Sequence, residues 1–295
     1  TDHSLAVGGG TEDTQYRISG GYTYQQGVAI ESDFERYSLR INLDNQTTDW
    51  LEVGTSLNIS RTIENISVSE DDLIITASRQ RPNVPVRTPG GGFGGPDQSN
   101  FQLNNPVGLA ELNTNKVMRN QAVGQVFANV DIMDNLTLNN EVNGTVSYGN
   151  DYVFQPTWEF GARTNDQAQS TRRSSSSTYW QIRNYLNYNT SFENLGGNAM
   201  GGHEVQVNRY NGLDGTRTGF PSNRVRELPA GDAQTATNGS YAGSSSLQSF
   251  FGRLNLDYDN RYLLTGNIRG DAASNFAPAN RWGVFPSLSA AWRVT

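Results

Sequence analysis

Arg36-Tyr37-Ser38-Leu39-Arg40-Ile41-Asn42-Leu43-Asp44 alternates polar and apolar side chains without a break over residues 36–44. If this stretch is extended, its apolar side chains share one face and its polar side chains share the other. Residues 51–60 repeat the pattern, with Leu51, Val53 and Ile59 on the apolar face. A period of two is typical of β-strands that have one apolar and one hydrated face. The two stretches therefore predict two β-strands of a sheet.

The same alternation recurs along the chain and predicts eleven strands in all. They are expected near residues 3–9, 14–24, 34–44, 50–60, 117–132, 136–149, 178–192, 199–209, 247–258, 261–271 and 283–294. Short connections near 10–13, 45–49, 133–135, 193–198 and 259–260 alternate with longer ones at 25–33, 61–116, 150–177, 210–246 and 272–282. Outer-membrane barrels alternate short periplasmic turns with longer external loops in this way. The predicted fold is all-β, an antiparallel transmembrane β-barrel.

Composition excludes several other classes of protein. The net charge of −7, from 22 basic and 29 acidic residues, argues against a nucleic-acid partner. The chain has no cysteine, which excludes disulfides, thiolate-bound metals and thiol nucleophiles. No stretch reaches the roughly 18 consecutive apolar residues of a membrane helix, but barrel strands hide their apolar face in alternation. Thr1 follows no signal peptide, so we expect a mature product or a fragment.

The longest connection, residues 61–116, is predicted to be an external loop that contains a short helix. Ser69-Glu70-Asp71-Asp72 is typical of a helix start, and Pro82 is expected to end the helix. The glycine run at 90–95 indicates a flexible segment. A loop of this length usually has a function or is disordered.

Several segments of this chain resemble the SusC/RagA family of TonB-dependent outer-membrane transporters of Bacteroidetes-type bacteria. The resemblance lies in Thr14–Tyr22, Asp33–Asp44, Pro82–Val86, Asn105–Ala110, Ser249–Asn255, Arg261–Thr265, Arg269–Ala277, Asn280–Ser287 and Ala290–Arg293. The family usually has glycine where Ala272 and Ala277 stand. The resemblance implies a barrel of 22 strands with a plug domain inside it.

This sequence contains about half of those strands. We find no stretch in it that resembles a plug domain. We therefore expect residues 1–295 to be a partial barrel from a longer protein, without its plug domain and remaining strands. An open half-barrel leaves unpaired backbone N–H and C=O groups facing lipid along its two edges. Each such group costs several kcal/mol of free energy, so the half-barrel should not be stable alone.

The resemblance also implies the function: TonB-dependent import of a glycan or peptide nutrient across the outer membrane. The implied partners are a SusD-like surface lipoprotein, the TonB complex acting through the plug, and outer-membrane lipid. No enzyme activity and no cofactor are expected. Two alternatives stay open, a secreted soluble carbohydrate-binding β-sandwich or adhesin and a passive porin.

The polar face of the strands contains ten charged residues that are expected to point into the lumen. They are Arg17, Arg36, Arg40, Glu52, Glu141, Arg183, Arg253, Asp257, Arg269 and Asp271. These side chains either line a solute path or pair with a plug domain, and we favour the plug contact. Substrate contacts are expected on external loops, where Phe93, Tyr152, Trp158 and Phe160 would stack on sugar rings or peptide side chains. The alternative is that these aromatic residues only fold the loops.

No catalytic, metal or cofactor-binding residue is predicted. His3 and His203, the only histidines, lie 200 positions apart and have no acidic cluster spaced for metal ligation. Asp71 and Asp72 form a candidate carboxylate pair, but the start of a helix explains both without any catalysis.

Overall fold

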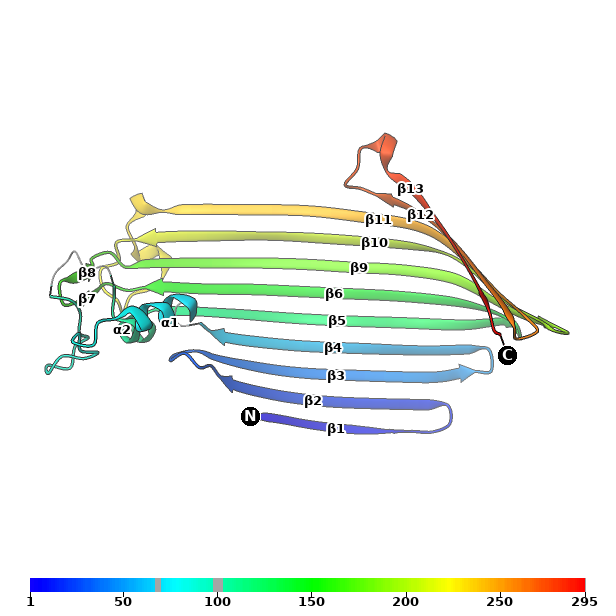
Figure 1. The fold of residues 1–295 in the computed structure, drawn as a ribbon, viewed down its shortest axis with the longest axis horizontal. Helices are drawn as coiled ribbons and strands as arrows, with labels where there is room; N and C mark the ends of the chain where they lie inside the picture. Colours follow the sequence, from blue (N-terminus) through cyan, green and yellow to red (C-terminus); the bar gives the residue numbers. More distant parts are fainter. Residues whose placement is uncertain (67–69, 98–102, 295) are drawn as a thin grey trace.

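Eleven strands of this computed structural model form one antiparallel sheet (Figure 1). The structure describes residues 1–66, 70–97 and 103–294. The strands are β1 (Asp2–Gly10), β2 (Thr14–Gln26), β3 (Asp33–Thr48), β4 (Leu51–Asn65), β5 (Thr114–Met133), β6 (Leu136–Gln155), β9 (Gln169–Phe192), β10 (Leu195–Thr218), β11 (Thr237–Tyr258), β12 (Tyr262–Ala273) and β13 (Trp282–Trp292). Each strand pairs with the next one along the chain, so the meander expected of an up-and-down barrel is present.

Connections of two or three residues join the strands at one end of the sheet, which we call the turn end. The longer connections gather at the opposite end, the loop end, and Figure 1 shows the helices and β7–β8 there. Short and long connections therefore alternate along the chain as the sequence predicted. The eleven strands make one sheet, which is not the two-sheet arrangement of a β-sandwich, within the part of the chain that is described.

The turn between β11 and β12 shows how the short connections work. Asp259 and Asn260 both have positive φ, 58° and 51°, and the Arg261 amide donates to the Tyr258 carbonyl at 3.0 Å. Two successive positive φ values define the type I′ turn, whose twist matches that of paired strands. Asp and Asn tolerate this left-handed conformation better than most residues. The pair thus fixes the register of the two strands.

Several strands extend further towards the loop end than the sequence predicted. Residues 169–177, 210–218 and 237–246 were expected to be loops, but they pair in β9, β10 and β11. These stretches were missed because strands were predicted from the alternation of polar and apolar residues, which is expected where one face of the strand meets hydrocarbon. The serine run 174–177 contains no apolar residue, so it shows no polar and apolar alternation.

The connection between β4 and β5 spans 66–113, rather than 61–116, and it is partly ordered. It contains α1 (Glu70–Arg79) and α2 (Pro106–Leu112), and the sequence predicted only the first of these helices. α1 ends at Arg79, before Pro82, whereas Ser69 of the predicted start lies outside the described residues. Neither helix is long and apolar enough to cross a membrane, nor is any other helix among the described residues.

Asn105 holds much of this loop together. Its side chain is almost fully buried, at 2% exposure, and its Oδ1 accepts from the Gly108 amide at 3.0 Å to cap α2. Its Nδ2 donates to the Val86 and Gly94 carbonyls at 2.7 and 2.9 Å. One side chain therefore ties the helix start to two points of the preceding glycine-rich segment.

The shorter elements also lie at the loop end. They are β7 (Trp158–Phe160), β8 (Arg163–Asn165), and the 3-10 helices η1 (Leu228–Ala230), η2 (Ala233–Thr235) and η3 (Pro278–Asn280). The connection between β10 and β11 folds back over the strands, since Arg226 reaches the Thr114 hydroxyl at 3.0 Å and lies 4.7 Å from the Phe154 ring centre. Phe220 of this connection forms a small buried apolar cluster with Phe154 and Ala168.

Candidate functional site

The pairing register gives the sheet one apolar face and one polar face. Ile41 lies between Ile18 of β2 and Leu57 of β4, so apolar side chains stand beside one another from strand to strand. Exposed residues of this apolar face are Leu5, Val7, Ile18, Leu39, Leu43, Ile59, Val126, Val142, Ile182, Leu186, Leu254, Leu264, Ile268, Val284 and Leu288. A water-soluble protein would bury a surface of this extent, whereas a lipid-facing barrel wall exposes it to hydrocarbon.

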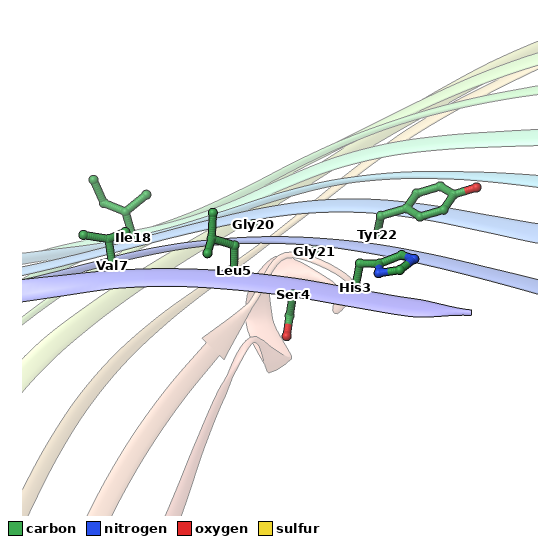
Figure 2. Close-up of a pocket in the computed structure, with 8 residues that line it drawn as sticks. All are labelled: His3, Ser4, Leu5, Val7, Ile18, Gly20, Gly21 and Tyr22. Atoms are coloured by element: carbon green, nitrogen blue, oxygen red, sulfur yellow. The ribbon is translucent and has the colours of Figure 1, made fainter.

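Figure 2 shows this separation of faces at the β1 edge of the sheet. Leu5 and Val7 of β1 project from the same side as Ile18 and Tyr22 of β2, while Ser4 points to the opposite side. Together with His3, these apolar side chains line a shallow groove. The groove belongs to the apolar face and not to a polar binding site.

Stacked aromatic rings mark the apolar face near the turn end. Tyr262 lies between Tyr258 and Trp292, with ring centroids 6.5 and 6.3 Å apart. Tyrosine and tryptophan concentrate where a barrel wall meets the bilayer interface. This row therefore has the position and composition of an interfacial aromatic girdle.

All ten charged residues that the sequence assigned to the lumen fall on the polar face of the sheet. They are Arg17, Arg36, Arg40, Glu52, Glu141, Arg183, Arg253, Asp257, Arg269 and Asp271. Their contacts differ from place to place. Glu52 accepts a hydrogen bond from Asn129 Nδ2 at 2.8 Å, whereas the Arg36 and Arg40 side chains are exposed.

Five charged residues of the polar face form a connected set, which we call the charge ladder: Glu141, Arg183, Glu204, Arg269 and Asp271. The first three stand side by side on β6, β9 and β10, and Arg183 forms an ion pair with Glu141. Arg269 binds Asp271 at 2.7 Å and Glu204 at 3.0 Å. The ladder spans the five adjacent strands β6, β9, β10, β11 and β12, and its charges lie on four of them, since β11 contributes the uncharged Ser249.

Glu204 was missing from the predicted set, although its place in the β10 alternation would have assigned it to the polar face. Its side chain is only 5% exposed, since Arg269 and the Gln206 amide both reach its Oε1. A buried carboxylate remains charged only when such partners replace water. Arg183 Nε is the one buried side-chain polar atom of the described residues that lacks a hydrogen-bond partner.

The four aromatic residues predicted to contact substrate separate into two groups. Phe93, Trp158 and Phe160 lie together: Trp158 stacks on Phe160 at 4.3 Å, and Phe93 meets Phe160 edge-on at 5.6 Å. Phe160 is fully buried, so it forms the centre of the folded loop and has no free face for a solute. Gly108 allows this packing, because a Cβ there would lie 2.6 Å from the Phe160 ring.

Tyr152 does not join that group. It is in strand β6 rather than in a loop, on the side that packs against Phe154 and Phe220. The Arg172 guanidinium covers its ring at 3.5 Å from the centroid. The ring therefore contributes to a cation–π contact within the wall.

The residues considered for metal binding lie apart from these groups. His3 stands on the apolar face beside Tyr22, and His203 stands on the same face beside the Phe250 ring at 4.8 Å. No group of three or more His, Asp or Glu that could hold a metal ion occurs among the described residues.

No protein-family model matches this chain. Curated proteins do: the chain is 28% identical to TonB-dependent receptor P3 of Formosa agariphila, over 98% of this chain and 30% of that protein. It is also 28% identical to TonB-dependent receptor SusC of Bacteroides thetaiotaomicron, over 100% of this chain and 31% of that protein. The chain is a SusC/RagA-like barrel segment. It spans about a third of the length of the curated relatives that it matches.

Solved structures agree with this segment at the level of the fold. The RagAB peptide transporter superposes with a TM-score of 0.79 and 20% identity, over 98% of the segment and 33% of that chain. The ferric citrate transporter FecA superposes less closely, with a TM-score of 0.56 and 9% identity, over the whole segment and 39% of that chain. The SusC/RagA-like segment thus has the fold of part of an outer-membrane β-barrel.

Proposed function

We propose that this segment is part of the wall of a TonB-dependent transporter that imports a glycan or peptide nutrient across the outer membrane. The observation that carries the proposal is the separation of faces over eleven strands. The apolar face suits hydrocarbon, and the opposite face is hydrated and charged. The similarity to TonB-dependent receptors over nearly the whole segment supports energised import rather than passive diffusion.

The turn end lies in the periplasm and the loop end lies outside the cell in this proposal. Connections of two or three residues are typical of the periplasmic side of such barrels, and longer connections of the external side. The loop that contains α1 and α2 is then external, where a SusD-like lipoprotein binds it and covers the barrel. Of the three predicted contact residues that lie in loops, Phe160 is buried, whereas Trp158 and Phe93 are partly exposed and available to a solute.

The charge ladder contacts a plug domain that another part of the protein supplies. A barrel of about 22 strands has a lumen wide enough to require a plug. Arg269 and Arg183 keep more than a third of their side chains exposed even while paired, so they retain donors for a partner on the polar face. A solute path alone would not require these side chains to be held in fixed positions by ion pairs, so we favour contact with a plug domain.

The proposal is tested in the organism with the complete gene. We expect deletion of the gene to abolish uptake of fluorescently labelled oligosaccharide or peptide, and a plasmid copy to restore it. A protonophore, which collapses the inner-membrane proton gradient, should stop uptake by the restored strain, because TonB draws on that gradient. A passive porin would continue to admit solute under the protonophore, and a secreted binding protein would be recovered from buffer without detergent.

A further inference from the structure

The polar face changes character between the charge ladder and the loop end. On β9, β10 and β11, the inward positions above Arg183, Glu204 and Ser249 are uncharged until Arg173 and Asp214 are reached. We call this area the tyrosine patch. It consists of Ser175, Ser177, Tyr179 and Gln181 on β9, Gln206, Asn208, Tyr210 and Gly212 on β10, and Tyr241, Gly243, Ser245 and Leu247 on β11.

Two tyrosines of this patch lie across glycines of the opposite strand in a reciprocal arrangement. Tyr210 is paired with Gly243, and Tyr241 is paired with Gly212. A Cβ on Gly243 would lie 2.4 Å from Cζ and Oη of Tyr210, and one on Gly212 would lie 2.6 Å from the same atoms of Tyr241. Each ring therefore occupies the space above a glycine, and the two ring centroids are 6.3 Å apart.

These rings are exposed although they lie against the wall. Tyr210 is 44% exposed and Tyr241 is 57% exposed. The backbone covers one side of each ring and leaves the other side open to the lumen. Ser177 stands next to Tyr210 on β9, and Ser175 stands next to Gly212, so hydroxyl groups border the rings.

We infer that the tyrosine patch binds neutral sugar rings as they pass along the inner wall. Aromatic faces provide apolar area for the C–H side of a pyranose, and their hydroxyl groups provide a polar edge. Ser, Asn and Gln side chains donate and accept hydrogen bonds and so match the hydroxyl groups of a sugar. No residue of the patch is charged, and Arg119, which borders it beside Ser175, is already paired with Asp151. This inference rests on the proposed function and narrows its substrate class to neutral glycans.

A purely structural role for the tyrosines makes a different prediction. Aromatic rings placed over glycines stabilise sheets by covering exposed backbone. In that case, removal of the rings lowers stability without a selective effect on ligand binding. The experiment must therefore measure affinity and stability on the same variants.

The full-length transporter, purified in detergent, is applied to an array of neutral oligosaccharides, acidic oligosaccharides and peptides. We expect the wild type to bind at least one neutral glycan, and the double variant Tyr210→Ala/Tyr241→Ala to bind it about tenfold more weakly. The double variant Tyr210→Phe/Tyr241→Phe keeps both rings and should stay within about threefold of the wild type. Tyr148→Ala is the matched control, since Tyr148 is 55% exposed but lies on the apolar face.

The inference is overturned if the wild type binds only acidic glycans or peptides, or no neutral glycan. It is also overturned if the Ala double variant keeps its affinity while its thermal stability falls. Failure of this inference can be separated from failure of the proposed function. One such result would be TonB-dependent uptake of a peptide at the same rate in the wild type and the tyrosine variants. That result would support the transporter assignment and contradict the sugar site.

Discussion

Arg269 on β12 reaches across the whole of β11 to bind Glu204 on β10, with Nη2 and Oε1 3.0 Å apart. On its way the same Nη2 donates to the Ser249 hydroxyl of β11 at 2.8 Å. Because Glu204 is 5% exposed and Arg269 is 36% exposed, the arginine closes the carboxylate off from the lumen. One side chain thus connects three strands on the polar face.

Replacing Arg269 with alanine should lower the free energy of unfolding by about 1–3 kcal/mol, because it leaves a buried carboxylate short of donors. The control is Arg253→Ala, on the same face, where the guanidinium contacts only the neighbouring Asn255 at 3.2 Å among the interactions described. Urea unfolding of the full-length barrel in detergent, followed by tryptophan fluorescence, measures both variants. If both variants lost the same free energy of unfolding, the ion pair between Arg269 and Glu204 would contribute no more to stability than the Arg253 contact.

Gly202 separates two aromatic rings of the polar face. A Cβ at this position would lie 2.5 Å from the Tyr185 Cβ and 2.8 Å from the Phe251 ring. We expect Gly202→Val to destabilise the barrel by about 1–3 kcal/mol through overpacking. Gly201→Ala is the control, because its nearest neighbour is 4.0 Å away on the opposite face. Heat-dependent mobility on gels compares the two, and an unchanged Gly202→Val melting point would show that the rings move aside freely.

Asn105→Ala should loosen the loop between β4 and β5 without affecting the barrel. The change removes a helix cap, a loss of about 1 kcal/mol. It also takes the side-chain donor from the Gly94 carbonyl, whereas the Val86 carbonyl keeps the Gly94 amide as its donor. Hydrogen exchange should rise in residues 85–97 and 103–112 and stay constant in β5 and β6. Asn113→Ala is the control, since Asn113 caps the other end of α2 only through its main-chain amide, 3.1 Å from the Leu109 carbonyl.

The two faces can be compared at adjacent positions of β12. Ile268 is 56% exposed on the apolar face, and Asn267 is exposed on the polar face. An arginine at position 268 should cost about 2–4 kcal/mol in a bilayer, as charged residues do near the middle of a barrel wall. An arginine at position 267 should cost far less, because its charge remains hydrated. Folding titrations into lipid vesicles test this, and equal costs would refute the assignment of the faces.

Much of the sheet could be predicted because hydrocarbon requires alternation. The pattern around Trp180 and Ile182 places β9, whereas serines 174–177 give no such pattern, since that stretch contains no apolar residue. Parity along each strand also assigned Glu141, Arg183 and Arg269 to the polar face. Their pairing depends on the register between strands, which the turns determine and which a shift of one residue would reverse.

The loop end was harder to predict from the sequence. The burial of Phe160 depends on Gly95 and Gly108 lying against it, and these contacts join positions far apart in the chain. The helix α2 did leave a local signal that was missed. Asn105 followed by Pro106 is a typical N-cap with proline in the first turn.

The central strands are longer than the apolar band of a membrane-spanning barrel requires. β9 and β10 each contain 24 residues, which corresponds to about 80 Å along the strand and about 60 Å of height at a usual tilt. The apolar band of such a barrel needs only about 25 Å. With the loop end outside the cell, as proposed above, the remaining height continues the barrel wall beyond the outer surface of the bilayer.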